Sequence, residues 1–134
     1  MFSCLKMNIT LEKTIVNKMN LHKIQGSKKA SRKFTLDYDV ETFEKDNERF
    51  IVRFNVIVQD TSTFKMSIEY IAVFKTTETV SETFLHSDFA KINAPAIAYP
   101  FLRSYISFVT LNSGYAPAML PTINFVVLSK KKFK

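Results

Sequence analysis

The sequence has little of what disulfides, phosphate loops and metal sites require. Its 134 residues include one cysteine (Cys4), two histidines (His22 and His86), two glycines and no tryptophan. A single thiol excludes an intrachain disulfide, and two glycines cannot build a glycine-rich phosphate loop. One cysteine and two separate histidines do not supply the convergent ligands of a zinc site. We therefore expect no metal and no cofactor.

Long apolar runs are also missing. No stretch reaches the ~18 apolar residues that identify a membrane-spanning helix. The first ten residues, MFSCLKMNIT, lack the continuous apolar core of a signal peptide. These features favour a protein without a membrane span in a reducing cytoplasm.

No catalytic motif is evident. His86-Ser87-Asp88 contains a base and a carboxylate of the kind that orients a base, but a lone trio of this kind is more typical of a surface turn. Asp37 and Asp39 alternate onto the polar side of a predicted strand, where solvated carboxylates are normal. We therefore expect a binding protein and not an enzyme.

Positive charge exceeds negative charge. The net charge is +7, and two lysine-rich clusters, residues 28–33 and 130–134, supply much of it. Such clusters attract acidic surfaces or nucleic acid. No predicted helix carries a basic stripe, however, and the aromatic residues lie among apolar ones. A solvated loop and a frayed basic tail (129–134) are therefore favoured over the further alternative, a nucleic-acid-associated binding module.

Alternation of apolar and polar residues predicts four β-strands. They cover about 5–25, 33–42, 49–58 and 63–75. The first strand loses its phase between Thr14 and Met19, which predicts a β-bulge. Short polar turns join the last three strands, so we expect an antiparallel sheet within a single domain of residues 1–134.

The two faces of this sheet differ in composition. One face is strongly apolar and has to be covered, and the 13 phenylalanines indicate an aromatic-rich core or apolar surface kept for partners. The other face mixes charged residues with Ile51, Ile57, Ile71 and Val73. A half-apolar face of this kind suggests contact with another subunit or with a bound polypeptide.

All four prolines and one glycine fall within residues 93–125. Pro95 suits the first turn of a helix that covers about residues 94–112. Pro100 predicts either a bend in this helix or a helix that properly begins at Pro100. Gly114 suits the end of the helix. Ser81 or Thr79 would cap a short lead-in helix. The helix side predicted to face the sheet consists of Ile97, Phe101, Leu102, Tyr105, Ile106 and Val109. The predicted fold is α+β: a four-stranded antiparallel sheet with a long proline-bent helix on one face.

The segment after this helix, YAPAMLPTINF, presents large apolar side chains between two prolines. This stretch and the helix before it resemble the SecB family of export chaperones and SecB-like chaperones. The resemblance rests on Asn93, Pro95, Tyr99, Pro100, Phe101, Arg103, Ile106, Val109, Gly114, Tyr115, Pro117, Leu120, Pro121, Asn124 and Phe125.

The resemblance implies an ATP-independent holdase, assembled as a dimer of dimers, that binds unfolded polypeptides in apolar grooves. Those grooves are bordered by the loop after the long helix and by the connection between the first two strands, residues 26–32. The implied client-binding residues are Tyr115, Pro117, Met119, Leu120 and Pro121. For Leu120 and Phe125 a place in the core is favoured. The expected oligomer contacts are Tyr105, Ile106, Val109, Ile71 and Val73.

The sequence departs from the export chaperones at its end. In that family a second helix and an acidic tail usually follow the Asn-Phe pair, whereas this chain stops nine residues after Phe125 in lysines. The basic tail and the positive net charge argue against docking on the SecA motor. The expected client is an unfolded polypeptide or preprotein. The alternative client is an antitoxin, because SecB-like proteins also serve toxin–antitoxin systems.

Overall fold

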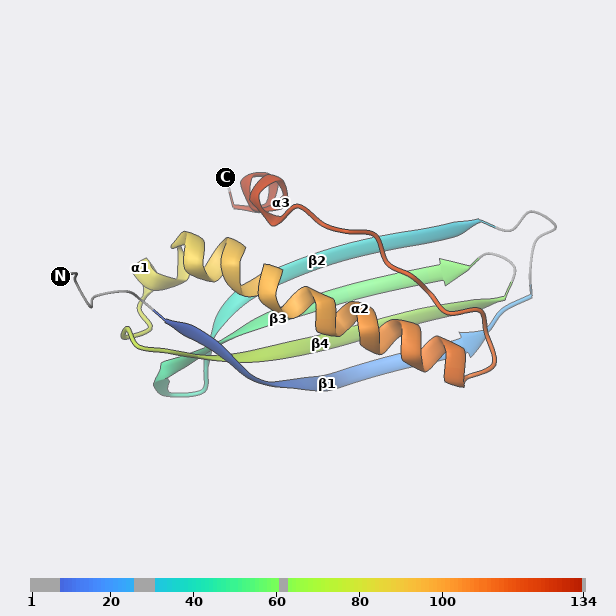
Figure 1. Ribbon diagram of the computed structural model, residues 1–134, viewed down its shortest axis with the longest axis horizontal. Coiled ribbons are helices and arrows are strands. Elements are labelled where there is room, and N and C mark those ends of the chain that lie inside the picture. Colours follow the sequence, from blue (N-terminus) through green and yellow to red (C-terminus); the bar gives the residue numbers. More distant parts are fainter. Residues whose placement is uncertain (1–7, 26–30, 61–62, 134) are drawn as a thin grey trace.

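The computed structural model describes residues 8–25, 31–60 and 63–133. Its sheet consists of strands β1 (Ile9–Lys23), β2 (Arg32–Phe43), β3 (Asp46–Asp60) and β4 (Phe64–Thr76). The spatial order is β1-β4-β3-β2, and every neighbouring pair is antiparallel (Figure 1). The predicted antiparallel sheet of four strands is therefore confirmed.

Helices cover one face of the sheet (Figure 1). In chain order they are α1 (Glu82–Leu85), a π-helical turn η1 (Phe89–Asn93), α2 (Ala94–Asn112) and α3 (Phe125–Lys132). The long helix α2 crosses the sheet face and confirms the predicted fold class. The helical lead-in before α2 is also present, and Ser81 caps α1 by accepting a hydrogen bond from the Phe84 N–H at 3.1 Å.

Proline and glycine act at α2 largely as the sequence indicates. Pro95 lies in the first turn, where a missing N–H leaves no helical hydrogen bond unmade. Pro100 does not begin the helix, because α2 is already helical from Ala94 and continues through the proline. Gly114 follows the helix with a φ of +95°, a backbone conformation that residues with a Cβ atom rarely adopt.

Two β-bulges determine which face of the sheet the side chains of β1 point to. The register against β4 shifts between Leu11 and Lys13 and again between Val16 and Lys18. The second shift lies inside the predicted interval, whereas the first does not. Between the two shifts Ile15 faces the side of the sheet away from α2, while Leu11 and Leu21 pack on the main core.

The core is rich in aromatic rings, which accounts for much of the phenylalanine content. The Phe50 ring stacks on Phe74 with centroids 5.3 Å apart. Phe125 meets Tyr38 and Tyr99 edge to face, at 5.4 Å and 5.6 Å. Such pairs add about 0.5–1.5 kcal/mol beyond the burial of their area.

The sheet face away from α2 closes over its own apolar residues. Ile51, Ile71 and Val73 are buried there, packed with Ile15 and Phe43. Of the four apolar residues noted on this face from the sequence, these three are buried within the protomer and Ile57 stays exposed, at 43%.

Ion pairs adjoin this small apolar cluster. Arg53 lies opposite Ile71 in the register and donates to Glu41 at 2.9 Å and to Glu69 at 2.6 Å. Arg49 donates to Glu12 on β1 at 2.6 Å and so joins β3 to β1 across β4. The charged groups of this face are thus largely engaged with one another.

The end of the chain differs from the expected frayed tail. The side chain of Asn124 caps α3 by accepting hydrogen bonds from the N–H groups of Val126 and Val127, at 3.0 and 3.2 Å. Lys132 pairs with Asp37 at 2.8 Å and with Asp39 at 3.4 Å. The sequence interpretation missed this helix because the apolar run Val126–Leu128 is too short to show a helical period.

Two buried tyrosines bind main-chain carbonyl groups. The Tyr38 hydroxyl donates to the Lys91 carbonyl oxygen at 2.7 Å, and the Tyr99 hydroxyl donates to that of Pro121 at 2.6 Å. Burial raises the pKa of each tyrosine to about 12, and for Tyr38 the negative charges of Asp37 and Asp39 add to the effect.

These pKa values predict sensitivity to alkali. Because the folded-state pKa lies above the ordinary value of about 10, the folded protein holds these protons longer than the unfolded chain. The contribution of these two tyrosines to the free energy of unfolding should therefore be constant below about pH 10 and be lost between about pH 10 and 12. Urea titrations across this range measure it, and Tyr38→Phe combined with Tyr99→Phe should flatten the slope. An unchanged slope in the double variant would contradict the assignment.

Candidate functional site

The loop of residues 115–121, called the helix loop here, connects α2 to the segment leading into α3. Two prolines and an irregular path prevent it from joining the sheet as a strand. The N–H of Tyr115 donates to the Thr110 carbonyl oxygen at 3.0 Å, and the loop then leaves α2. Its remaining backbone groups need partners wherever they are buried.

The central partner is the hydroxyl group of Thr110. Thr110 is fully buried on α2, and its Oγ1 accepts a hydrogen bond from the Ala118 N–H at 2.9 Å. The same hydroxyl group lies 2.8 Å from the Ile106 carbonyl oxygen, to which it donates. Ala118 is itself fully buried, so the middle of the helix loop is tied to the helix from inside.

Longer side chains hold the rest of the helix loop by its carbonyl groups. Arg103 Nε donates to Leu120 at 3.1 Å, and the Tyr99 hydroxyl donates to Pro121. Arg32 Nη1, on β2, lies 3.5 Å from the carbonyl oxygen of Pro117 in the helix loop, which is a long contact for a hydrogen bond. Three residues of α2 thus fix a loop that has no strand partner of its own.

The five predicted client-binding residues differ in exposure. Met119, Pro117 and Pro121 are exposed, and Met119 is 66% exposed despite its apolar side chain. Leu120 is 3% exposed and belongs to the core, as favoured from the sequence. Tyr115 is half-buried, with its ring 4.8 Å from that of Phe64. Its large side chain therefore serves the fold at least in part.

Exposed Met119 borders a groove between the helix loop and α2, called the helix groove. The groove has a volume of about 540 Å³. Its lining is Pro100, Arg103, Ser104, Ser107, Phe108, Leu111, Met119 and Leu120. Phe108 and Leu111 are 65% and 58% exposed, so most of its apolar lining is in contact with solvent.

A second groove, called the edge groove, lies between β2 and α3. Its volume is about 350 Å³. Its lining is Phe34, Leu36, Thr122, Ile123, Asn124, Val127, Leu128 and Lys131. β2 is the end strand of the sheet, which leaves this side of the molecule open. The connection of residues 26–30, expected to border a groove, lies outside the described residues.

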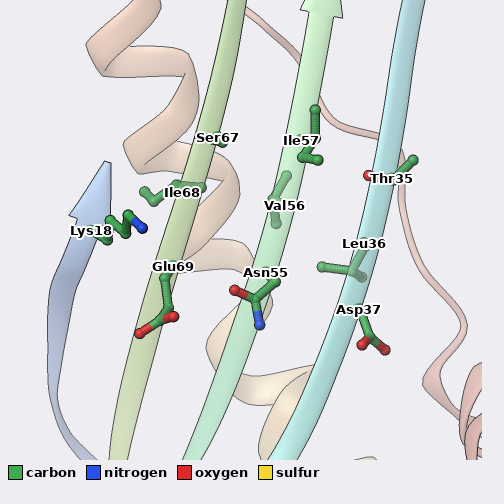
Figure 2. A pocket seen from close by; sticks show the side chains of 10 residues that line it. All are labelled: Lys18, Thr35, Leu36, Asp37, Asn55, Val56, Ile57, Ser67, Ile68 and Glu69. Carbon is green, nitrogen blue, oxygen red and sulfur yellow. The ribbon is translucent and has the colours of Figure 1, made fainter. Parts of the chain in front are cut away.

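A third depression lies on the opposite face of the sheet and has a different character. Figure 2 shows Glu69, Asn55 and Asp37 side by side on β4, β3 and β2, and the register pairs Asn55 with each of the other two. Lys18 and these carboxylates give the depression mixed charge. Charges that face one another on a polar surface make a poor site for an apolar segment.

The outward side of α2 carries a row of exposed apolar residues, called the outer stripe. Ile97, Phe101, Phe108 and Leu111 form it, at 41–65% exposure. The sequence interpretation placed Ile97 and Phe101 against the sheet, and the structure corrects this. The small residues Ala94 and Ala98 occupy buried positions near the start of the helix, while the outer side is apolar as well, so periodicity alone could not distinguish the two sides.

The predicted oligomer contacts lie mostly inside the protomer. Ile106 is fully buried, and Ile71 and Val73 are 8% and 1% exposed. Tyr105 and Val109 are half-buried and pack against the core, with the Tyr105 ring 5.9 Å from that of Tyr70. Only Tyr105 and Val109 retain surface for a further contact.

The anchors of the helix loop are the residues that sequence reasoning missed. Tyr99 and Arg103 were noted within a motif but given no role, and Thr110 was not noted. A lone threonine within an apolar helix was the available signal, because a buried hydroxyl group needs a hydrogen-bond partner.

Other kinds of site find no support in the part of the chain that the structure describes. Within residues 8–25, 31–60 and 63–133, no three His, Cys, Asp or Glu side chains gather as metal ligands. None of the helices in these ranges is long and apolar enough to cross a membrane.

Comparison with known proteins identifies the family. The model of the family described as preprotein translocase subunit SecB matches residues 8–134. The chain therefore belongs to the SecB family, and the resemblance inferred from residues 93–125 is confirmed.

Curated relatives match over part of their length. The protein-export protein SecB of Jannaschia sp. is 38% identical over 71 residues, which are 53% of this chain and 40% of the relative. The SecB of Afipia carboxidovorans is 32% identical over 75 residues, or 56% of this chain and 45% of the relative. The matched part of the chain thus spans less than half the length of these relatives.

Solved structures share the fold at low sequence identity. A SecB-like chaperone of Mycobacterium tuberculosis, solved in complex with a peptide from an antitoxin, superposes with a TM-score of 0.70 at 14% identity. The match covers 86% of this chain and 89% of that one. A protein of unknown function from Streptococcus agalactiae gives a TM-score of 0.58 at 12% identity, covering 87% and 99%.

Thr110→Val tests the anchoring of the helix loop. The substitution keeps the shape of the side chain but leaves the buried Ala118 N–H without its acceptor, which should cost about 1–3 kcal/mol of stability. Thr110→Ser keeps the hydroxyl group and serves as the control, with a smaller loss. Chemical denaturation measures both. A loss in Thr110→Ser that equals or exceeds the loss in Thr110→Val would show that the hydroxyl group is not the main anchor.

Proposed function

We propose that this protein is an ATP-independent holdase chaperone that binds non-native polypeptide in its helix groove and edge groove. The observation that carries the proposal is the exposure of Met119, Phe108 and Leu111 around a loop that is itself firmly held. Membership of the SecB family supports it. No catalytic step forms part of the proposal.

The physical basis is a fixed apolar surface with an adaptable rim. Unfolded chains expose apolar side chains, and large apolar area kept on a folded surface commonly marks a binding site. The hydrogen bonds to Thr110, Arg103 and Tyr99 keep the helix loop from collapsing into the groove. The unbranched side chain of Met119 can adjust to different client side chains.

The proposed clients are preproteins awaiting export, with an antitoxin as the alternative. Curated relatives named protein-export protein SecB favour preproteins. The chaperone from M. tuberculosis was solved with an antitoxin peptide, which favours the alternative. Both clients are non-native polypeptides met in the cytoplasm, so both use the same surface. Pull-down with quantitative mass spectrometry would distinguish them.

Two partners considered from the sequence are not included. Docking on SecA is left out because the net charge is +7 and Lys132 already pairs with Asp37 and Asp39. Nucleic acid is left out because Lys132 is engaged in this way and Lys131 lines an apolar groove.

The proposed assembly is a homo-oligomer, with a dimer of dimers as the expected form. The part of the outer stripe formed by Ile97 and Phe101 offers it a better surface than the contacts expected from the sequence, because these two residues are exposed and line neither groove, whereas Ile106 is buried. Tyr105 and Val109 adjoin the stripe and keep a supporting role.

Met119→Ala tests the holdase proposal. Loss of most of an exposed methionine side chain should weaken client binding about ten-fold and leave the melting temperature unchanged. Suppression of the aggregation of a denatured protein without nucleotide measures it. Met19→Ala, an exposed methionine on β1 outside both grooves, is the control. No suppression by the wild-type protein at several-fold excess would count against the proposal.

A double variant, Ile97→Ser with Phe101→Ser, tests the assembly. Removal of two exposed apolar side chains should shift the mass measured by light scattering toward the monomer while the circular dichroism spectrum is retained. Ile57→Ser is the control, since Ile57 is an exposed apolar residue on the opposite face of the sheet. A mass that is unchanged in the double variant would exclude the outer stripe as the interface.

A further inference from the structure

The two grooves share an electrostatic feature. Among the residues that line them, the helix groove has one charged side chain, Arg103, and the edge groove has one, Lys131. Both are cationic, and neither lining contains a carboxylate. An apolar segment that enters either groove therefore meets positive charge.

Lys131 is the more available of the two cations. Arg103 is half-buried and donates to the Leu120 carbonyl oxygen, so part of its bonding capacity serves the fold. Lys131 is exposed and pairs with no carboxylate of the described residues. The neighbouring Lys132 pairs with Asp37 and Asp39, which do not line the edge groove, so Lys131 is the charged side chain that a segment in this groove meets.

We propose that the edge groove selects segments that combine apolar residues with acidic ones. An apolar side chain of the client fills the space between Phe34, Ile123 and Val127, and a carboxylate near it pairs with Lys131. The proposal rests on the proposed function and adds the chemical class of client: acidic, apolar stretches of unfolded polypeptide.

The geometry also favours an extended client. Phe34 and Leu36 are two residues apart on β2, so both face the groove from the same side of the strand. β2 is the end strand, and an extended chain beside it would present alternate side chains to the same side. The preferred segment therefore turns every second side chain toward the groove, and these groove-facing side chains combine apolar residues with an acidic residue that lies beside Lys131.

Three labelled peptides test the proposal by fluorescence anisotropy with the full-length protein. They share the same apolar residues at alternate, groove-facing positions and carry glutamate, glutamine or lysine at one further groove-facing position. One exposed ion pair contributes about 0.2–1 kcal/mol, so the glutamate peptide should bind up to about five-fold more tightly than the glutamine peptide in low salt. The lysine peptide should bind most weakly, and added salt should reduce the differences.

Two variants separate the groove from the overall charge. Lys131→Glu should remove or reverse the preference for the glutamate peptide. Lys130→Glu changes the net charge equally on the same helix but does not alter the groove lining, so it should retain the preference. Equal effects of the two variants, or equal affinities of the three peptides for the wild type, would overturn the acidic preference while the holdase proposal stands. Failure of every peptide to bind, together with no suppression of aggregation, would overturn both.

Discussion

The hydrogen bond between the Thr110 hydroxyl and the Ala118 N–H is the contact on which the candidate site depends. It joins two fully buried residues on either side of the turn that ends α2. Without it, a buried donor in a loop without strand partners would lack an acceptor. With it, and with the carbonyl contacts made by Arg103 and Tyr99, a proline-rich segment stays fixed beside a helix while Met119 remains in solvent. The exposed apolar surface is thus a consequence of satisfied backbone groups beneath it.

The two sides of the sheet differ in how many of their large apolar residues are exposed. Its face away from α2 buries Ile51, Ile71 and Val73 within the protomer beside arginine ion pairs. On the other side, the outer stripe and the two grooves keep apolar residues exposed. The capacity to bind non-native polypeptide and the capacity to assemble are therefore proposed for the same side, around α2 and α3. The charged side chains that line the two grooves on this side, Arg103 and Lys131, are both cationic.

Sequence patterns predicted the sheet and the long helix because their physical signals are local. Alternation marked β2, β3 and β4, and Pro95 and Gly114 marked the ends of α2. The short helix α3 was missed, since its stability comes from the Asn124 cap and from rings packed on Tyr38 rather than from its own composition.

The side of α2 that packs on the sheet and the residues that anchor the helix loop were harder to predict, because both depend on parts of the chain outside the helix. Apolar residues occur all around α2, so the choice between Ile97 and Ala98 as the buried residue depends on the space above the sheet. The role of Thr110 depends on a loop eight residues further along the chain. Met119 was predicted from the resemblance as a client-binding residue; the structure leaves it 66% exposed, and its role in client binding stays a proposal.

Hydrogen exchange of the Ala118 amide, measured by NMR, tests the central claim most directly. The account predicts that this amide is protected far more strongly than that of its exposed neighbour Met119, although both lie in an irregular loop. It also predicts that the protection persists when a client is bound, because the loop is held from inside. Exchange of Ala118 as fast as that of an unfolded chain would show that the loop is mobile and would contradict a preformed groove.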